Sequence, residues 1–334
     1  MGRMLQLGKR LGVWTSILFI FALVLSACGQ QPAAENKEAA GSANAAAPAA
    51  EQVRKVKHSM GETEIKGTPK RVVILTNEGT EALLALGVKP VGAVKAFTGN
   101  PWYEHTKAQL EGVTVVGDES QPNIEQIAAL KPDLIIGNKM RQEKVYEQLK
   151  AIAPTVFSDV LRGEWKNNFQ LYAEALNKKA EGDKIIADFD KRIEEFKKQA
   201  GDKLNKKVSV ARFMAGKTRI YNTDTFTGVI FKQIGIARPD TVLNAKNSFA
   251  DEITKERLPE LDTDILFYFT YETGDGAANK TEQEWLNDPL WKNMNVVKSG
   301  NAHKVSDVIW NTSGGVIAAN QMLTELAKFY DVKL

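Results

Sequence analysis

The sequence predicts an α/β fold of two lobes, each built on a mostly parallel β-sheet, joined by one long helix. From Arg71 onward, short β-branched runs alternate with helical patterns, which is typical of parallel strands connected by helices. Residues 183–199 carry one apolar stripe on a charged background, which predicts a long amphipathic helix. The alternation resumes after it. These observations predict lobes at residues 53–180 and 203–334 around a connecting helix at residues 181–202.

The first 52 residues have the features of an export signal followed by a tether. Three basic residues flank the start of the apolar run 11–25, and small residues then lead to Cys28, the only cysteine. The stretch Leu25-Ser26-Ala27-Cys28 looks like a bacterial lipobox, in which Cys28 would carry lipid. The alternative is an incidental cysteine in a cleaved signal or an uncut anchor. We expect a signal peptide at residues 1–27 and a flexible tether at residues 28–52.

Composition narrows the class of protein and its location. We expect a protein that is exported and held by lipid on the outer face of the cell membrane, or in the periplasm if the host has an outer membrane. A single cysteine excludes a disulfide within one chain. The net charge is 44 minus 41, or +3, and the signal supplies three of the basic residues without an acidic one, so the mature chain is nearly neutral. We therefore expect no nucleic-acid partner, and we expect a monomer.

Buried strands and helices of the N-terminal lobe follow from apolar runs and their flanking residues. Residues 71–75 predict a buried strand, Asn77 is the expected cap of the next helix, and Gly87 ends that helix. The other predicted elements are strands at 90–94, 113–116, 134–136 and 155–157 and helices at 124–130 and 142–152.

The connecting helix and the second lobe are predicted in the same way. The apolar stripe of the long helix consists of Ile185, Phe189, Ile193 and Phe196. The predicted elements beyond it are strands at 208–213, 219–221, 265–269 and 304–308 and a helix at 228–234.

One short pattern occurs in both halves of the chain. Residues 123–136 and 254–267 each predict a short helix, a turn and a buried strand. If the match is a real repeat and not a coincidence, Glu125 and Glu256 occupy equivalent positions on the two lobes.

Motifs for catalysis and metal binding are missing from the sequence. We find no Gly-x-Ser-x-Gly elbow, no P-loop, no His-Glu-x-x-His helix and no paired cysteine motif. The three histidines His58, His105 and His303 do not pair at helical ligand spacing. These three histidines could form a site for a bare metal ion, or they could be ordinary surface or core residues. The sequence therefore favours a binding protein over an enzyme.

Four segments, taken in their order along the chain, resemble those of a known protein family. They are PKRVVI at 69–74, TEALLALG at 80–87, the stretch 123–136 that begins NIE and ends KPDLII, and WNTSGG at 310–315. With them the chain resembles the iron-siderophore and vitamin B12 family of substrate-binding proteins over nearly its whole mature length. The resemblance implies two Rossmann-like lobes on one rigid connecting helix, with a ligand cleft between the lobes.

The same resemblance implies the partners. The protein would deliver a ferric siderophore to an ABC permease for iron uptake, and Glu125 and Glu256 would dock onto permease arginines. The alternative is that Glu125 and Glu256 have no role in docking, because the helix dipole alone favours acidic residues near the start of a helix. The siderophore itself fills the coordination sites of the iron, so we expect no cofactor and no direct metal ligand from the protein.

Two arginines are candidate contacts for an anionic chelate. Residues 137–142 and 210–213 look like the branch of the family that takes hydroxamate or carboxylate siderophores. Arg141 and Arg212 are expected at strand ends, outside which ligands of open α/β sheets bind. Surface or structural ion pairs are the alternative. The loop 303–311 has no arginine, which favours a citrate-hydroxamate over a tri-citrate-like ligand.

Aromatic side chains are expected to complete the cleft, because their rings offer apolar walls with polar tips. Core packing or surface exposure is the alternative for each. Trp310 is the first candidate, since it follows a predicted strand and precedes Gly314-Gly315. The other candidates are Trp102, Tyr103, Trp165, Tyr221 and Tyr271.

Two further functions compete with siderophore binding. A haem or cobalamin receptor on the same scaffold could use Met140 or His105 as an axial ligand. An exported hydrolase could use His303 with Asp307, although no nucleophile motif accompanies them.

Overall fold

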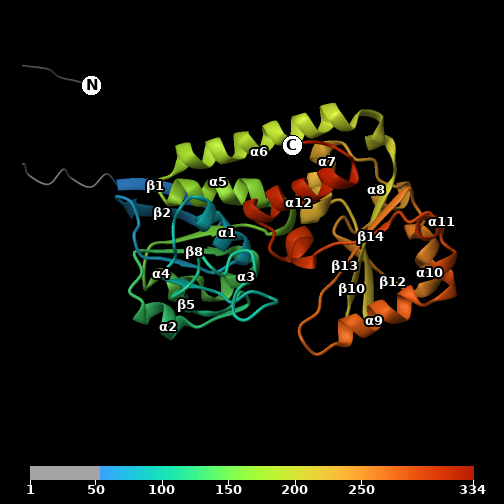
Figure 1. Ribbon diagram of the computed structural model, residues 1–334. Coiled ribbons are helices and arrows are strands. Elements are labelled where there is room, and N and C mark those ends of the chain that lie inside the picture. Colours follow the sequence, from blue (N-terminus) through green and yellow to red (C-terminus); the bar gives the residue numbers. More distant parts are fainter. Residues whose placement is uncertain (1–52) are drawn as a thin grey trace, which may run out of the picture. The chain divides into compact units, whose positions relative to one another are not determined.

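The N-terminal lobe is built on a five-stranded parallel sheet (Figure 1). The computed structural model describes residues 53–334. The strands lie in the order β5-β4-β3-β8-β9, and each neighbouring pair is parallel. Their bounds are Thr114–Val115 (β5), Gly92–Ala93 (β4), Val72–Ile74 (β3), Leu134–Asn138 (β8) and Thr155–Ser158 (β9). The parallel sheet predicted from the sequence is confirmed. Two hairpins accompany it: β1 (Val53–His58) with β2 (Gly61–Lys66), and β6 (Gly117–Asp118) with β7 (Gln121–Pro122).

Helices α1 (Asn77–Ala85), α2 (Ile124–Ala129) and α5 (Trp165–Ala175) belong to this lobe. The expected cap of α1 is one residue off, because Thr76 and not Asn77 is the N-cap. The Thr76 hydroxyl accepts a hydrogen bond from the Gly79 N–H at 3.0 Å. The side chain of Asn77 instead donates to Glu119 at 2.9 Å. The first turn of α1 is therefore tied to the β6–β7 hairpin.

The predicted helix at residues 142–152 is wrong as a single element. The chain forms α3 (Lys139–Gln142), a 3₁₀ turn η1 (Glu143–Val145) and α4 (Tyr146–Lys150). The buried Gln142 side chain accepts a hydrogen bond from the Asn138 N–H at 2.7 Å and donates to the Leu75 carbonyl at 3.0 Å. The backbone leaves α-helical geometry at Gln142 (φ −120°, ψ 12°) and again at Val145 (φ −111°, ψ 6°), so residues 142–152 do not form one helix.

The C-terminal lobe has a five-stranded mixed sheet in the order β12-β11-β10-β13-β14. Strands β10, β13 and β14 are mutually parallel, whereas β11 and β12 run antiparallel to their neighbours. The bounds are Ala250–Ile253 (β12), Lys217–Tyr221 (β11), Val208–Met214 (β10), Ile265–Thr270 (β13) and Ala302–Lys304 (β14). The expected strand 304–308 is wrong: β14 ends at Lys304, and Val308–Thr312 forms a π-helical turn, η5. The turn is closed by a hydrogen bond from the Ser313 N–H to the Val308 carbonyl at 3.0 Å, and the Trp310 carbonyl accepts from the Thr227 hydroxyl.

Short helices surround the second sheet. Their bounds are Phe226–Ile234 (α7), Asp240–Leu243 (α8), Lys255–Leu261 (η4, a 3₁₀ helix), Ala277–Leu286 (α9), Pro289–Asn293 (α10), Asn295–Lys298 (α11) and Val316–Phe329 (α12). The two 3₁₀ segments η2 (Arg162–Glu164) and η3 (Gly201–Asn205) flank α5 and α6.

The long helix α6 (Lys179–Ala200) runs past both lobes (Figure 1). It contacts α5 in the first lobe and α7 and α12 in the second. Its buried stripe is Ile186, Phe189, Ile193 and Phe196, so Ile186 takes the place expected for Ile185. Among residues 53–334 no helix is long and apolar enough to span a membrane.

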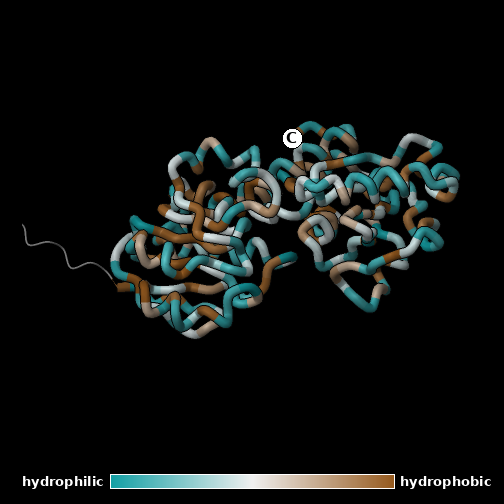
Figure 2. The backbone as a smooth tube through the Cα atoms, turned by 90° about the horizontal axis from the view of Figure 1, so that it is seen from below, coloured by the Kyte–Doolittle hydropathy of each residue, from teal (hydrophilic) through white to brown (hydrophobic). Residues whose placement is uncertain are grey.

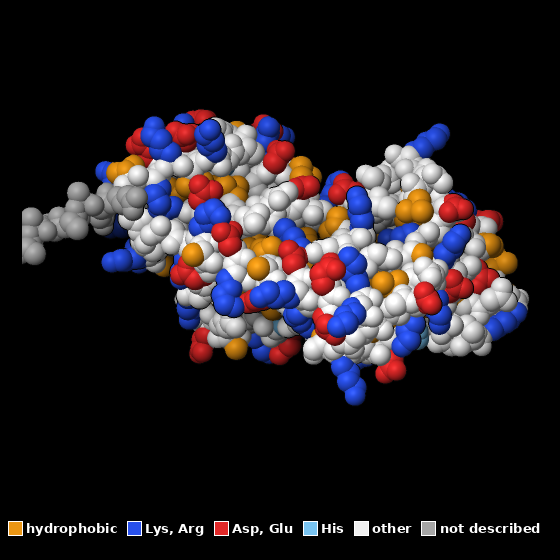
Figure 3. Space-filling model, turned by 90° about the horizontal axis from the view of Figure 1, so that it is seen from above, with side chains coloured by type: hydrophobic (Ala, Val, Ile, Leu, Met, Phe, Trp, Pro, Cys, Tyr) orange, Lys and Arg blue, Asp and Glu red, His pale blue; other side chains and the backbone are white. Residues whose placement is uncertain are grey.

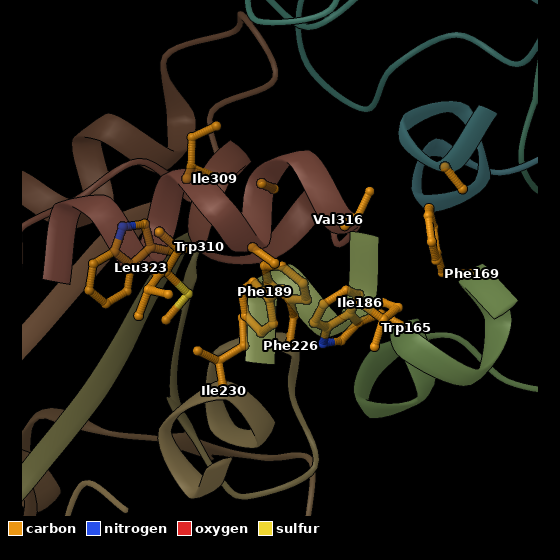
Figure 4. Packing of buried hydrophobic residues seen from close by; sticks show 14 of the residues in the cluster. Trp165, Phe169, Ile186, Phe189, Phe226, Ile230, Ile309, Trp310, Val316 and Leu323 are labelled. Carbon is orange, nitrogen blue, oxygen red and sulfur yellow. The ribbon is translucent and has the colours of Figure 1, made fainter. Parts of the chain in front are cut away.

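One hydrophobic cluster joins the two lobes beneath α6. It includes Trp165 and Phe169 of α5, Phe189 of α6, Phe226 of α7 and Leu323 of α12. Figure 4 shows these side chains converging between the helices. Figure 2 shows hydrophobic segments in the interior of each lobe, and Figure 3 shows charges of both signs mixed on one outer face. Because the cluster is shared, we expect the lobes to unfold together.

Replacing Ile193 by alanine is expected to lower the free energy of unfolding by about 2–5 kcal/mol, because the fully buried side chain leaves a cavity in this cluster. Urea unfolding followed by circular dichroism measures the change. The control is Leu243→Ala, whose side chain is 58% exposed and whose loss should cost less than about 0.5 kcal/mol. Equal losses in both variants, or two separate transitions in the wild type, would contradict the shared core.

Candidate ligand-binding cleft

A cavity of about 360 Å³ lies between the two lobes. The first lobe contributes its wall through Glu78, Phe97, Glu119, Met140, Arg141, Leu161 and Arg162. The second lobe contributes Arg212, Arg219, Tyr221, Phe226, Phe249, Tyr271 and the loop Asn311–Gly314. Four arginines and two glutamates therefore share a small space with several aromatic rings. This position is the one expected for open α/β sheets, in which ligands bind beyond the carboxyl ends of the strands.

Arg212 is braced inside the second lobe. Its Nε and Nη2 donate to the two carboxylate oxygens of Asp307 at 2.7 and 3.1 Å, and its Nη1 donates to the Tyr221 hydroxyl at 2.8 Å. The guanidinium carbon lies 4.5 Å from the centroid of the Tyr271 ring. Arg212 is only 7% exposed. A buried arginine with a bidentate partner is rigid, so this side chain offers the cavity a positive charge in a fixed place.

The other three arginines keep their donors available. Within the part of the chain that the structure describes, the side chains of Arg141, Arg162 and Arg219 donate no hydrogen bond at normal distance to another residue. Arg141 approaches Glu119 with Nε 3.5 Å from Oε2, which is an ion pair of poor geometry. Arg219 lies directly opposite Arg212 in the β10–β11 ladder, so two positive side chains stand on the same face of the sheet. Asp307 offsets the charge of Arg212, which leaves the charge of Arg219 to attract an anionic ligand.

Arg162 is held in an unusual backbone conformation at the edge of the cavity. Its φ is 81°, in the left-handed region that residues with a side chain rarely adopt. The guanidinium lies 4.2 Å from the centroid of the Phe249 ring, so a side chain of the first lobe reaches an aromatic ring of the second. Strain of about 1–3 kcal/mol is commonly retained at functional sites, which supports a role for Arg162 in ligand contact.

Two buried glutamates face the arginines from the first lobe. Glu119 is in the turn of the β6–β7 hairpin, and its Oε1 accepts hydrogen bonds from the Asn77 N–H at 2.6 Å and from the Asn77 amide at 2.9 Å. Burial raises the pKa of Glu119, while the bonds from Asn77 oppose the rise. Burial raises the pKa of Glu78 to about 8, against the opposing hydrogen bond from Asn168. Glu78 is therefore mostly protonated at neutral pH.

A third buried glutamate, Glu81, connects the lobes beside the cavity. Its Oε1 accepts a hydrogen bond from the Ser313 hydroxyl and lies 2.6 Å from Nε2 of His105. Its Oε2 accepts from the Ala318 N–H at 2.8 Å, in the first turn of α12. Carboxylates are stabilised at helix N-termini by the free N–H groups and the helix dipole. Glu81 thus fixes the loop before α12, which forms part of the cavity wall.

Four of the eight residues predicted as ligand contacts line the cavity: Arg141, Arg212, Tyr221 and Tyr271. Their environments differ. Tyr221 is 1% exposed and uses its hydroxyl as an acceptor for Arg212, whereas Arg141 has an exposed side chain on α3. The structural ion pair considered as an alternative for Arg212 is present, with Asp307. Contact of these four residues with a ligand stays a prediction.

The other four predicted contacts are placed elsewhere. Trp310 is 0% exposed, packs on Phe267 with ring centroids 4.7 Å apart, and donates its indole N–H to Glu325. Trp165 is 2% exposed in the shared core. Trp102 packs partly buried against that core, and Tyr103 is 4% exposed with its hydroxyl donating to the Thr312 carbonyl at 3.3 Å. These aromatic residues were predicted to face the cleft because they lie in or next to loops. The loops fold inward over the core, so the side chains are buried there.

The residues predicted for other roles are also placed. Glu125 and Glu256 are both exposed in the first turns of α2 and η4, one in each lobe. Cys28 lies outside the described residues. His303 packs against Phe267 and Phe329, while Asp307 is bound to Arg212, so these two residues form no pair. His105 is bound to Glu81, and Met140 lines the cavity.

Several lining residues were missed from the sequence, chiefly Arg162, Arg219, Glu78 and Glu119. A signal existed for Arg162, because it follows β9 as Arg141 follows β8, and these two strands are neighbours. A signal also existed for Arg219, since a two-residue turn between β10 and β11 places it opposite Arg212. No cluster of three or more His, Cys, Asp or Glu suited to a metal ion occurs in residues 53–334.

The raised pKa of Glu78 predicts a stability that falls with pH. Between its ordinary value of 4.5 and its folded-state value of about 8, the folded protein holds a proton that the unfolded chain has released. The free energy of unfolding should therefore fall in this window, by up to about 1.4 kcal/mol per pH unit, and Glu78→Gln should remove that fall. Urea unfolding from pH 4.5 to 8.5 measures it, with the exposed Glu104→Gln as control. Parallel curves for wild type and Glu78→Gln would contradict this assignment.

Comparison with known proteins places this fold and cleft in a family. The chain is 50% identical over 325 residues to the probable siderophore-binding lipoprotein YfiY of Bacillus subtilis, covering 94% of this chain and 97% of that protein. It is 29% identical to the Fe(3+)-citrate-binding protein YfmC of the same organism, covering 94% and 95% of the two chains. The crystal structure of Staphylococcus aureus SirA complexed with staphyloferrin B matches with a TM-score of 0.76 and 36% identity, over 84% of this chain and 99% of that one.

The family model described as periplasmic binding protein matches residues 72–304, a span that runs from β3 to β14 and includes most of the cavity wall. The two-lobed fold predicted from the sequence is confirmed by these comparisons. The chain belongs to the periplasmic binding protein family.

Proposed function

We propose that this chain is the substrate-binding protein of an ABC importer and that it captures a ferric siderophore in the cleft between its lobes. The observation that carries the proposal is the set of three arginines that face the cavity with their hydrogen-bond donors free. The names of the relatives YfiY and SirA, one a probable siderophore-binding lipoprotein and the other complexed with staphyloferrin B, support it. Binding needs no bond to be made or broken, because the siderophore itself coordinates the iron.

The charge of the cavity selects among ferric siderophores. Three hydroxamate anions neutralise Fe³⁺ fully, so a ferric trihydroxamate gives the arginines little to bind. A citrate unit brings a carboxylate and an alkoxide to the iron, and the chelate keeps a net negative charge. Guanidinium groups bind carboxylates well in a partly buried site. We therefore propose a citrate-hydroxamate or a more carboxylate-rich ferric chelate as the ligand.

The location and assembly proposed from the sequence fit this role. A lipid on Cys28 would hold the exported protein at the outer face of the cell membrane, and residues 28–52 would act as the tether. Confinement near the permease raises the effective concentration of the loaded protein. We propose that the protein acts as a monomer, with domain boundaries at 53–180, 181–202 and 203–334, and that Glu125 and Glu256 contact the permease.

Arg219→Ala should weaken binding of a ferric citrate-dihydroxamate by about 10- to 100-fold, since it removes a charge-assisted contact worth about 1.5–3 kcal/mol. Binding of a neutral ferric trihydroxamate should change less than about threefold, which is about 0.6 kcal/mol. Quenching of tryptophan fluorescence in protein lacking residues 1–28 measures both affinities, with inner-filter controls. The matched control is Lys217→Ala, which removes an exposed positive charge from the same strand outside the cavity.

The same titration decides between ligand classes when ferric citrate, haemin and cobalamin are included. Met140 lines the cavity and could serve haem as an axial ligand, so saturable quenching by haemin alone would replace the siderophore proposal. An equal loss in Arg219→Ala and Lys217→Ala would show that Arg219 acts only through general charge. No response to any of the five ligands would contradict the proposed function.

The double variant Glu125→Ala/Glu256→Ala should bind the ferric chelate with unchanged affinity but fail to support its uptake. Both side chains are exposed and neither lines the cavity, so ligand contacts are not altered. Uptake of ⁵⁵Fe-labelled chelate by cells whose own copy is deleted measures delivery. Glu104→Ala/Glu284→Ala removes one exposed carboxylate from each lobe as the control. Normal uptake by the Glu125/Glu256 variant would rule out docking through these residues.

A further inference from the structure

One carboxylate oxygen of Glu119, a residue of the cavity wall, has no hydrogen-bond partner in the described part of the chain. Glu119 is 3% exposed and lines the cavity wall. Its Oε1 is fully engaged by the two donors of Asn77. Its Oε2 is buried and accepts no hydrogen bond from any residue in the described part of the chain. Buried carboxylate oxygens are normally paired, so an unpaired one in the wall of a ligand cavity points to a partner that arrives with the ligand.

The position of this oxygen is fixed from both ends of the residue. The Gln142 amide donates to the Glu119 carbonyl, which holds the backbone of the hairpin turn. The Asn77 N–H and amide hold Oε1 against the first turn of α1. Oε2 therefore cannot turn away to find another donor. A preorganised acceptor of this kind costs little to order when a ligand binds.

Each wall of the cavity carries two arginines, but its carboxyl groups lie on one wall only. The wall of the second lobe carries Arg212 and Arg219, while the wall of the first lobe carries Arg141 and Arg162 with Glu119 and the mostly protonated Glu78. An anionic ligand face fits the arginines of the second lobe but would leave Glu119 desolvated and unpaired. A ligand that also carries a hydrogen-bond donor on its other face satisfies both walls.

We propose that Oε2 of Glu119 accepts a hydrogen bond from an N–H group of the bound siderophore, and so selects chelates that carry an amide or amine nitrogen beside their anionic groups. This inference rests on the proposed function and deepens it. In a citrate-dihydroxamate, the amide N–H groups that link citrate to its two arms are donors of this kind. Arg141 is the competing partner, but its Nε is 3.5 Å away and its side chain is 41% exposed.

The test pairs one protein change with one ligand change. A ferric citrate-dihydroxamate and its analogue with both amide nitrogens methylated are titrated against wild type and Glu119→Gln by fluorescence quenching. Wild type should prefer the N–H form by about tenfold or more. Glu119→Gln should lose this preference, because the two donors of Asn77 retain the amide oxygen and leave the NH₂ group at the former position of Oε2.

The methylated chelate serves as the internal control. Glu119→Gln should bind it at least as well as wild type does, which also shows that the variant is folded. Glu104→Gln, an exposed change outside the cavity, should keep the wild-type preference. If Glu119→Gln does not fold, Glu119→Asp repeats the test, since its shorter side chain withdraws the carboxylate from the donor.

Each outcome separates the inference from the proposed function. Wild-type binding of both chelates with equal affinity would overturn the inference alone. The same preference for the N–H form in wild type and in Glu119→Gln would also overturn it. Failure of wild type to bind either chelate, or any other ferric siderophore, would overturn the proposed function and the inference with it.

Discussion

The buried carboxylate of Glu81 holds the two lobes together at the cleft, and the shape of the cavity depends on it. It belongs to α1 of the first lobe, yet it accepts hydrogen bonds from Ser313 and from the first turn of α12. Gly315 shows how closely the elements approach, because a Cβ atom there would lie 2.6 Å from Glu81 Oε2. The loop that lines the cavity is thus set by a contact made behind it. A cleft fixed in this way binds with little loss of conformational freedom.

The cavity combines one arginine that is braced by its neighbours with three that donate no side-chain hydrogen bond within the described residues. Arg212 donates hydrogen bonds to Asp307 and Tyr221. It therefore contributes positive electrostatic potential to the cavity more than direct hydrogen bonds to a ligand. Arg219 lies opposite Arg212 in the β10–β11 ladder, and its side chain donates no hydrogen bond to another described residue. Asp307 offsets the charge of Arg212, so the charge of Arg219 is the one left without a partner on this wall. Under the proposed function an anionic chelate would bind it, and Glu119 on the facing wall would limit which chelates fit.

The fold was predictable where local sequence and packing agree. The runs that became β8 and β10 are mostly apolar, and the stripe on α6 has helical spacing, so burial and periodicity both indicate the element. Prediction failed where a distant contact decides local structure. Gln142 looks like the first residue of a helix, but its buried side chain bonds to the Leu75 and Glu119 carbonyls and it is the last residue of α3. Trp310 lies in a polar segment, but the segment folds inward and its ring packs in the core. Neither contact can be read from neighbouring residues.

The candidate site was less predictable than the fold, because its charge is assembled from separate elements. The absence of arginine from the loop 303–311 suggested a weakly charged ligand, but the four arginines of the cavity come from α3, η2, β10 and β11. Counting the charges of one loop therefore underestimates the positive electrostatic potential in the cavity. What matters is the register of β11 on β10 and the adjacency of β8 and β9, which bring residues as far apart as Arg141 and Arg219 to one space. Substitutions at Arg141 and Arg219, which donate no side-chain hydrogen bond within the described residues, can change the preferred ligand while both sheets stay intact. Substitution of Arg212 would instead leave the buried Asp307 without its partner.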